Sequence, residues 1–304
     1  MPQLNLPLPF ARAVLHPIFR VMLNKRLPFT VQRALMDLGA PAQGAPRGTH
    51  AERIRLGGRP AERVTAGPAT DTATVLYLHG GGYTVGSPAT HRPIAGFLAR
   101  ETGCPVQVLD YRLAPEHSFP AALDDAEAAF LELIAFGYQP ERIAVAGDSA
   151  GGGLALALAI RLRDKHGLAP AALGLIAPWG DPNEIPERTR DLVINKPWSR
   201  ACAAAYLGGG DGLDVGYAPL LAAMHGLPPT YVQADKGELL HDQCTRLVAK
   251  LRAAGVETRF TETDGLWHVS QLQAALVAPA AAITRELGEF LRQALRPAQT
   301  RSIG

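Results

Sequence analysis

The chain is predicted to adopt an α/β fold with a mostly parallel sheet. Two observations lead to this prediction: short apolar, β-branched runs alternate with segments of helical periodicity, and one such run breaks abruptly into a helix at residues 147–153. An alternation of strands and helices supplies the crossovers that parallel strands need. With 304 residues, 47% of them hydrophobic, the chain can bury one large core, or a core with a lid.

The N-terminal 38 residues carry apolar positions at helical spacing, with basic residues between them, and predict an amphipathic helix. Two roles fit such a helix: a piece of lid over an apolar pocket, or a surface helix that dips into a membrane interface. We favour the lid, because the basic residues do not form the dense face that is typical of interfacial helices. Residues 39–49 are rich in Gly, Pro and Ala and predict a connection.

The remaining elements follow from the same alternation. Strands are expected at 52–55, 63–65, 73–78, 106–109, 142–146, 172–177, 230–235 and 257–261, and helices at 93–100, 121–134, 154–160, 239–254 and 280–295. Residues 183–216 lose this rhythm and contain several Pro and Gly residues. They are interpreted as an insertion that supplies the other half of the lid.

The break at 147–153 places Ser149 between Gly147 and Gly151, which is the spacing of a nucleophile elbow. So sharp a turn leaves no room for a Cβ at the flanking positions, and it presents the serine hydroxyl at a helix N-terminus. A glycine-rich turn of this kind could instead cradle a phosphate. The P-loop lysine and the G-x-G-x-x-G order are both absent, so we prefer the elbow.

A second glycine cluster, residues 80–82, follows His79 at the end of an expected strand. Backbone N–H groups can converge on an oxyanion only where no side chains crowd them. A merely flexible turn would not require three consecutive glycines after a histidine. The cluster therefore predicts an oxyanion-binding loop.

A serine nucleophile needs a base, and the base needs an acid that orients it. His268 follows the last expected strand and is the predicted base. Its competitors are weaker, because His117 precedes the serine and His241 is expected within a helix. Three carboxylates at or after strand 230–235 stay open as the acid: Asp235, Glu238 and Asp242.

The amino-acid composition limits the classes of partner and the cellular compartment that we expect. The formal charge of +2 and the absence of a basic run give no footprint for nucleic acid, so a small molecule is the expected partner. Three cysteines without C-x-x-C spacing suggest neither a disulfide framework nor a zinc site. No secretory signal and no apolar run of about 18 residues is visible, and we expect a cytoplasmic protein without stable membrane insertion.

The motifs together resemble one family. The order HGGG, YRLAPEH, GDSAGGG, PW-x-D and a late acid and histidine is similar to that of the bacterial hormone-sensitive-lipase-like carboxylesterases, from about His50 to the C-terminus. The resemblance implies an α/β-hydrolase catalytic core over residues 49–304 and a helical cap formed by residues 1–48 and 183–216. It implies no cofactor and no metal, and hydrolysis of esters with short to medium acyl chains. A homodimer is compatible with it.

The resemblance also assigns roles. Ser149 becomes the nucleophile and His268 the base, and the N–H groups of Gly81, Gly82 and Ala150 form the oxyanion hole. The acid departs from the common Asp-Pro-Leu-x-Asp pattern: aligning Leu240 with the family leucine selects Glu238, with Asp235 second and Asp242 third. The aromatic candidates for the substrate pocket are Tyr83, Trp179, Tyr206 and Trp267, each of which could equally be core.

Two other functions use the same residues or fold. A non-catalytic small-molecule receptor would lack a working histidine, so His268 argues against it. Amide hydrolysis needs an identical triad, and fold analogy does not determine the leaving group.

Overall fold

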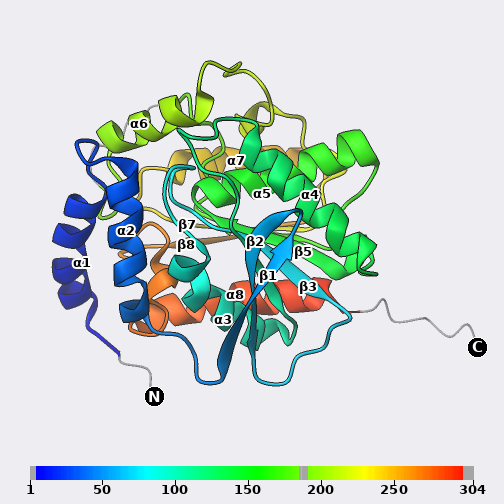
Figure 1. Cartoon of the computed structure of the whole chain (residues 1–304), viewed down its shortest axis with the longest axis horizontal. Helices are drawn as coiled ribbons and strands as arrows, with labels where there is room; N and C mark the ends of the chain where they lie inside the picture. The colour runs from blue at the N-terminus through cyan, green and yellow to red at the C-terminus, as the bar shows by residue number, and fades with distance from the viewer. Residues whose placement is uncertain (1–4, 185, 187–190, 297–304) are drawn as a thin grey trace, which may run out of the picture.

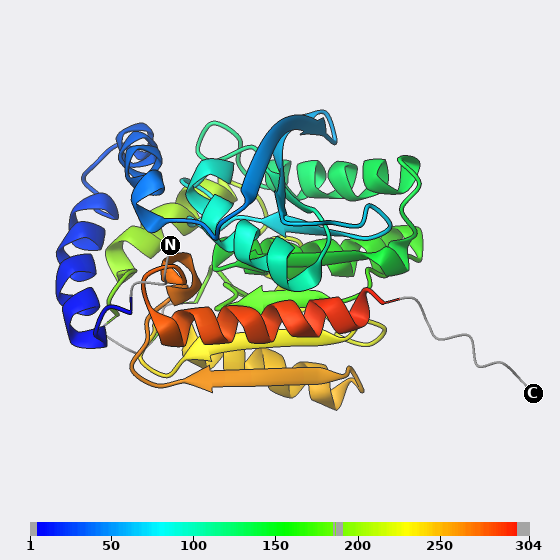
Figure 2. The same cartoon turned by 90° about the horizontal axis from the view of Figure 1, so that it is seen from below.

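A computed structural model describes residues 5–184, 186 and 191–296. In these residues one eight-stranded sheet runs in the order β1-β2-β4-β3-β5-β6-β7-β8 (Figures 1 and 2). β1 and β2 pair antiparallel, β2 pairs antiparallel with β4, and all later pairs are parallel. The predicted mostly parallel α/β sheet is confirmed.

The bounds of the elements are as follows. The strands are β1 (Thr49–Leu56), β2 (Arg59–Ala66), β3 (Thr74–Leu78), β4 (Val106–Leu109), β5 (Ile143–Asp148), β6 (Leu173–Ile176), β7 (Thr230–Asp235) and β8 (Thr258–Thr263). The α-helices are α1 (Leu8–Met22), α2 (Phe29–Gly39), α3 (Pro88–Thr102), α4 (Ala121–Ala135), α5 (Ala150–Arg161), α6 (Lys196–Leu207), α7 (His241–Ala253) and α8 (Ala278–Ala294). Short helical turns are η1 (Ala40–Gln43), η2 (Pro140–Arg142), η3 (Leu162–His166), η4 (Pro219–Leu221) and η5 (Ser270–Gln273).

Both faces of the central strands are buried, because successive side chains of a strand point to opposite sides. Leu76, Leu78 and Val145 join a core with α4, α5 and α7. Val75 and Tyr77 join a second core with α3 and α8. This double burial explains why the central strands are continuous apolar runs in the sequence.

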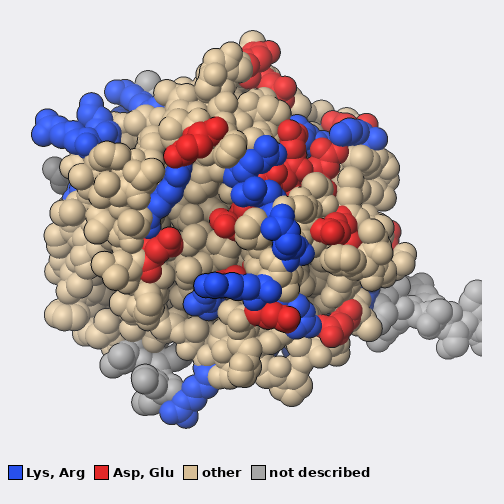
Figure 3. All heavy atoms as spheres, in the orientation of Figure 1, with Lys and Arg blue, Asp and Glu red and all other residues tan. Residues whose placement is uncertain are grey.

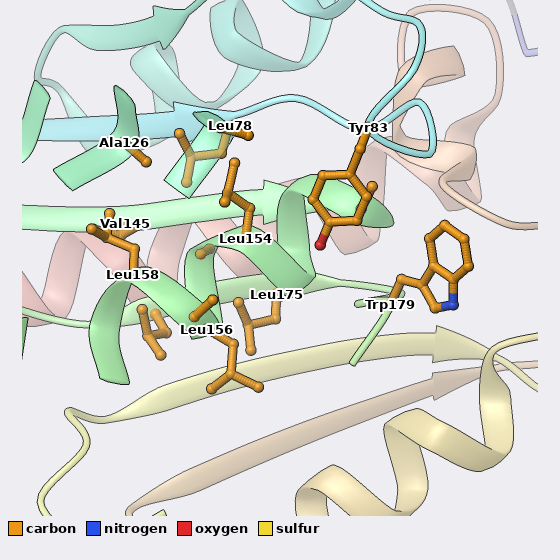
Figure 4. Close-up of a cluster of buried hydrophobic side chains, with 14 of the residues drawn as sticks. Leu78, Tyr83, Ala126, Val145, Leu154, Leu156, Leu158, Leu175 and Trp179 are labelled. Atoms are coloured by element: carbon orange, nitrogen blue, oxygen red, sulfur yellow. The ribbon is translucent and has the colours of Figure 1, made fainter. Parts of the chain in front are cut away.

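The helix that follows the serine is buried along its whole length. In Figure 4, Leu154 and Leu158 of α5 lie against the sheet near Val145, and Tyr83 and Trp179 lie at the carboxyl-end edge of this cluster. The core thus continues directly into the region where the loops after the strands meet.

The N-terminal segment differs from the single expected helix. It forms two helices, α1 and α2, separated by residues 23–28. Pro28 is the N-cap of α2, and because the residue before a proline is disfavoured in the α conformation, α2 begins only after it. The two helices lie on the side to which β7 and β8 point (Figure 2).

Helix α6 is tied to this pair by side-chain hydrogen bonds. Trp198 Nε1 donates to Gln32 Oε1 at 2.8 Å, and Asn195 Nδ2 donates to the carbonyl of Leu23 at 2.9 Å. Segments far apart in sequence, 1–48 and 183–216, therefore meet beside the carboxyl ends of the strands, although residues 1–4, 185 and 187–190 of them lie outside the described residues. Within the described part of the chain, no helix has the length and apolarity that crossing a membrane requires.

Candidate active site

Ser149 lies at the sharp turn between β5 and α5, with φ 52° and ψ −120°. The turn brings backbone so close that a Cβ on Gly147 would lie 2.6 Å from the carbonyl oxygen of Leu78, and one on Gly151 would lie 2.0 Å from the same oxygen. Both flanking positions therefore require glycine. The expected elbow geometry is present, and it puts the serine Oγ at the start of a buried helix.

His268 reaches the serine from the loop after β8. Its Nε2 lies 2.9 Å from Ser149 Oγ, and both side chains are buried. The imidazole is thus placed to accept the hydroxyl proton. The two competing histidines are elsewhere: His241 is the first residue of α7 and pairs with Glu262, and His117 is exposed.

Of the three candidate acids, Glu238 faces the histidine. Its Oε2 lies 3.5 Å from His268 Nδ1, and the carboxyl is 2% exposed. This distance is longer than an ordinary N–H···O bond of about 2.7–3.2 Å, and neither Glu238 Oε1 nor His268 Nδ1 has a hydrogen-bond partner among the described residues. Asp242 points away, with a side chain that is 71% exposed.

Asp235 has a different task. Its Oδ1 accepts from the N–H of Gly237 at 2.9 Å, and its Oδ2 accepts from Thr263 Oγ1 at 2.8 Å and from the N–H of Leu266 at 2.9 Å. One buried carboxylate thus joins the turn that carries Glu238 to the loop that carries the histidine. Both oxygens of Asp235 therefore accept hydrogen bonds that position the two loops, and neither faces His268.

A fourth carboxylate, Asp191, was not identified from the sequence. Its Oδ2 accepts from the N–H of Leu239 at 2.8 Å, directly after Glu238, and its Oδ1 accepts from Val193 and Ile194. Asp191 belongs to the insertion 183–216. A side chain of this segment therefore holds the turn that carries Glu238. A charged stretch in the sequence gave no indication of which carboxylate would be buried.

The pKa of His268 is set by burial and by the carboxylates around the ring. Burial alone would lower the pKa of the imidazole, but the Glu238 carboxylate, with smaller contributions from Asp191 and Asp148, outweighs burial and raises it above 6.5. The negative groups around the ring therefore favour its protonated form.

The glycine loop after β3 faces the elbow. Gly81 has φ 118°, and a Cβ there would lie 2.2 Å from the carbonyl oxygen of Val85; Gly82 has φ 61°. In the described part of the chain, the N–H groups of Gly81, Gly82 and Ala150 donate to no protein acceptor. They are free to bind a developing negative charge.

Asp148 fixes this loop relative to the serine, a role that the sequence did not reveal. Its Oδ1 accepts from the N–H of Gly80 at 3.1 Å and from Tyr77 Oη at 2.8 Å, and it lies 3.3 Å from His91 Nε2. Burial would raise the pKa of Asp148, but His91 and Tyr77 outweigh burial and lower it. The residue before the nucleophile thus holds the oxyanion loop as an ionised acceptor.

Arg33 of α2 holds the same loop from outside. Its Nε donates to the carbonyl of Thr84 at 2.7 Å, its Nη2 donates to the carbonyl of Ala114 at 2.8 Å, and the guanidinium forms a bidentate pair with Glu116. The N-terminal segment therefore braces the loop after β3 and the YRLAPEH loop together.

Arg12 of α1 acts similarly on the histidine loop. Its Nη1 donates to the carbonyls of Gly265 at 2.8 Å and Leu266 at 3.2 Å. Each N-terminal helix thus contributes one arginine that binds backbone next to the site.

Three of the four aromatic candidates lie together. Tyr83 stacks on Tyr206 with ring centroids 3.7 Å apart, and the ring centroid of Trp179 is 6.2 Å from that of Tyr83. Trp267 lies apart and donates from Nε1 to Gln273 at 2.9 Å. All four side chains are buried.

A cavity of about 220 Å³ adjoins this cluster. Its lining includes Trp179, Tyr217, Ala203 and Leu207, together with the charged residues Glu184, Lys196 and Arg200. The backbone N–H of Trp179 donates to the carbonyl of Ser149 at 2.8 Å, which connects this lining to the elbow. Among the described residues, no group of His, Cys, Asp or Glu side chains is arranged to hold a metal.

Comparison with known proteins agrees with this geometry. A family model described as the alpha/beta hydrolase fold matches residues 75–272. The chain is 38% identical to the carboxylesterase/phospholipase LipF of Mycobacterium tuberculosis over 84% of this chain and 71% of the relative. It is 36% identical to an acetyl-hydrolase of Streptomyces hygroscopicus over 79% of this chain and 85% of the relative.

Solved structures give the same result. An esterase from the bacterial hormone-sensitive lipase family superimposes with a TM-score of 0.89 at 37% identity, covering 94% of this chain and 98% of the other. A structure of EstE5 superimposes with a TM-score of 0.86 at 33% identity, covering 92% and 98%.

Proposed function

Because this chain belongs to the bacterial hormone-sensitive-lipase-like carboxylesterases of the α/β-hydrolase superfamily and is a carboxylic ester hydrolase, we propose that Ser149, His268 and Glu238 are its catalytic triad. The observation that carries the proposal is the position of His268, with Nε2 at 2.9 Å from the serine Oγ and Nδ1 facing Glu238. Both other candidate acids are engaged elsewhere or exposed.

The reaction proceeds in two halves. His268 removes the proton of Ser149 as Oγ attacks the acyl carbon, and then gives that proton to the departing alcohol. Water repeats the sequence against the acyl-enzyme with the same base. Glu238 keeps Nδ1 protonated and stabilises the imidazolium, so the distance between Glu238 and His268 is expected to shorten as the ring becomes charged.

The oxyanion is proposed to bind the N–H groups of Gly81, Gly82 and Ala150. Their lack of protein acceptors supports this role. Donors already held in place before charge develops are worth about 10²–10³ in kcat each. In this chain Asp148 and Arg33 provide that rigidity from opposite sides of the loop.

We propose that residues 1–48 and 183–216 act as the cap and that the acyl group is short to medium in length. The cavity lined by Trp179, Leu207 and Tyr217 supports the acyl limit, because about 220 Å³ is below the ~300–1,000 Å³ that is typical of sites for larger ligands. The relatives are named as ester hydrolases, one of them an acetyl-hydrolase, and amide hydrolysis is not proposed. Trp267, which packs away from this cluster, is the weakest of the four pocket candidates.

A panel of p-nitrophenyl esters of increasing acyl length tests this assignment. We expect kcat/KM to be highest for the short acyl groups and to fall steeply for long ones, because the cavity holds only about 220 Å³. Enlarging it with Leu207→Ala should move the optimum to longer acyl groups. A flat profile, or an optimum at long chains in the unaltered protein, would contradict the proposed pocket.

The pH dependence offers a second test. The base must be neutral to accept a proton, and a raised pKa keeps His268 protonated to higher pH. Activity should therefore fall on the acidic side with a midpoint above 6.5, the ordinary value for histidine. The measurement is kcat/KM against pH for a soluble ester, which reports the free enzyme. An acidic limb centred at or below 6.5 would show that the carboxylates do not act on the ring as proposed.

We further propose that the protein resides in the cytoplasm. Cys104, Cys202 and Cys244 are all buried and unpaired, which fits a reducing compartment. A homodimer stays a prediction.

A further inference from the structure

Helices α1 and α2 carry an exposed apolar surface that nothing in the catalytic site uses. Seven of the eleven large hydrophobic side chains that are exposed in the described residues belong to these two helices. They repeat at helical spacing on the outer side of each helix, and we call them the N-terminal apolar face: Phe10, Val14, Ile18, Val21, Val31, Leu35 and Leu38. The two helices contact each other, so these residues share one region of the surface.

These side chains are substantially exposed. Phe10 is 57% exposed, Val21 61% and Leu38 80%, whereas the opposite sides of the same helices pack inward through Ala11 and Gln32. In Figure 3 the area over α1 and α2, at the left, is largely free of charged atoms. Contiguous apolar surface on the outside of a folded chain marks a site of interaction.

The charge of the same segment indicates the partner. Residues 1–39, up to the end of α2, contain five Lys and Arg residues and one acidic residue, Asp37. Lys25 and Arg26 lie in the exposed turn between α1 and α2, and Arg20 lies in the last turn of α1. Among the described residues, none of these three cations forms an ion pair. Basic side chains are visible at the upper-left edge of the uncharged area in Figure 3.

We propose that the N-terminal apolar face docks the protein on an anionic lipid surface. An amphipathic helix with apolar residues on one side and cations beside them binds at the boundary between headgroups and acyl chains without spanning the bilayer. Each Lys or Arg near an anionic surface adds attraction. A second copy of the chain fits less well, because a two-fold contact would bring two segments of net positive charge face to face.

Sedimentation with phospholipid vesicles tests the proposal on the full-length protein. The probes are vesicles of phosphatidylcholine alone and of phosphatidylcholine with an equal part of phosphatidylglycerol. We expect binding to the anionic vesicles, weaker binding to the neutral ones, and loss of the difference at high salt. Binding is measured as sedimented protein, so the result does not depend on the catalytic assignment.

Two sets of variants separate the contribution of the apolar side chains to vesicle binding from that of the basic side chains. Phe10→Gln with Val21→Gln should weaken binding about tenfold or more, because two bulky apolar side chains no longer enter the interface. Lys25→Gln and Arg26→Gln should each weaken binding to anionic vesicles about fivefold. Phe136→Gln is the matched control: this side chain is 64% exposed but ends α4, outside the N-terminal segment, and its loss should change nothing.

Hydrolysis of a soluble short ester and the thermal unfolding curve should be unchanged in these surface variants, which shows that they are folded. The proposal is overturned if the unaltered protein ignores anionic vesicles, or if Phe10→Gln with Val21→Gln binds as tightly as the control. It is also overturned if the chain is a dimer in solution and that double variant is a monomer, because the face would then bind another copy.

Discussion

Replacing Ser149 by alanine removes ester hydrolysis, with an expected loss of about 10⁶ in kcat, the scale seen when a triad serine is deleted. The reason is geometric: of the serines that the structure describes, Ser149 is the one with an imidazole nitrogen at 2.9 Å and a glycine loop opposite it. The fold should be unaffected, because Oγ makes no other contact that holds the elbow; the turn is held by backbone bonds to Ile176 and Trp179.

The measurement is turnover of a chromogenic ester combined with labelling by an organophosphonate and mass spectrometric mapping of the label. Ser270→Ala is a suitable control, since Ser270 is buried nearby but its Oγ has no partner in the described residues. The control should keep full activity and labelling at Ser149. A label on another serine, or substantial activity in Ser149→Ala, would refute the assignment of the nucleophile.

Replacing Glu238 by glutamine should cost about 10⁴ in kcat, because the amide keeps the shape of the side chain but favours the wrong imidazole tautomer. Glu238 is the candidate acid whose carboxylate faces His268 Nδ1. The acidic limb of the pH profile should also move to lower pH in Glu238→Gln, since the largest contribution that raises the pKa of His268 is lost.

The two other carboxylates provide the controls. Asp242→Asn changes an exposed side chain and should have no effect. Asp235→Asn replaces an acceptor of three donors, so we expect a loss of stability of about 1–3 kcal/mol, seen as a lower Tm, with far more residual activity than Glu238→Gln. If Asp235→Asn were inactive while Glu238→Gln still turned over substrate, the acid would be Asp235.

Much of the fold follows from the sequence because its central strands are buried on both faces. The run 73–78 is mostly apolar and 230–235 has an apolar centre, and the observed strands coincide with both within a residue. β1 was harder to delimit, because it is an edge strand with mostly exposed residues and shows little hydrophobic alternation. Only four of its positions, 52–55, were expected.

The site could be predicted as far as local motifs extend. The elbow and the glycine loop are each contained in a few adjacent residues, and their close backbone contacts demand glycine in the sequence itself. The chemistry of the residues leaves Asp235 and Glu238 open, because the choice depends on where a turn directs each carboxylate. Glu238 is selected only by the resemblance, through the alignment of Leu240. Asp191 and Arg33 act through residues 48 and 51 positions away, so their roles became visible only in three dimensions.

The hydrogen bonds of Arg12 and Arg33 to the loops beside the site affect how the protein loses activity on heating. In α1 and α2, which hold the loops beside Gly82 and His268, the fully buried residues are Ala11 and Gln32, whereas apolar side chains that pack against the core, such as Phe19 and Met36, are only partly buried. Segments with few buried contacts open at a lower free energy than the core of a domain. We therefore expect the α1–α2 pair to open before the sheet melts, so that activity is lost at a lower temperature than the fold.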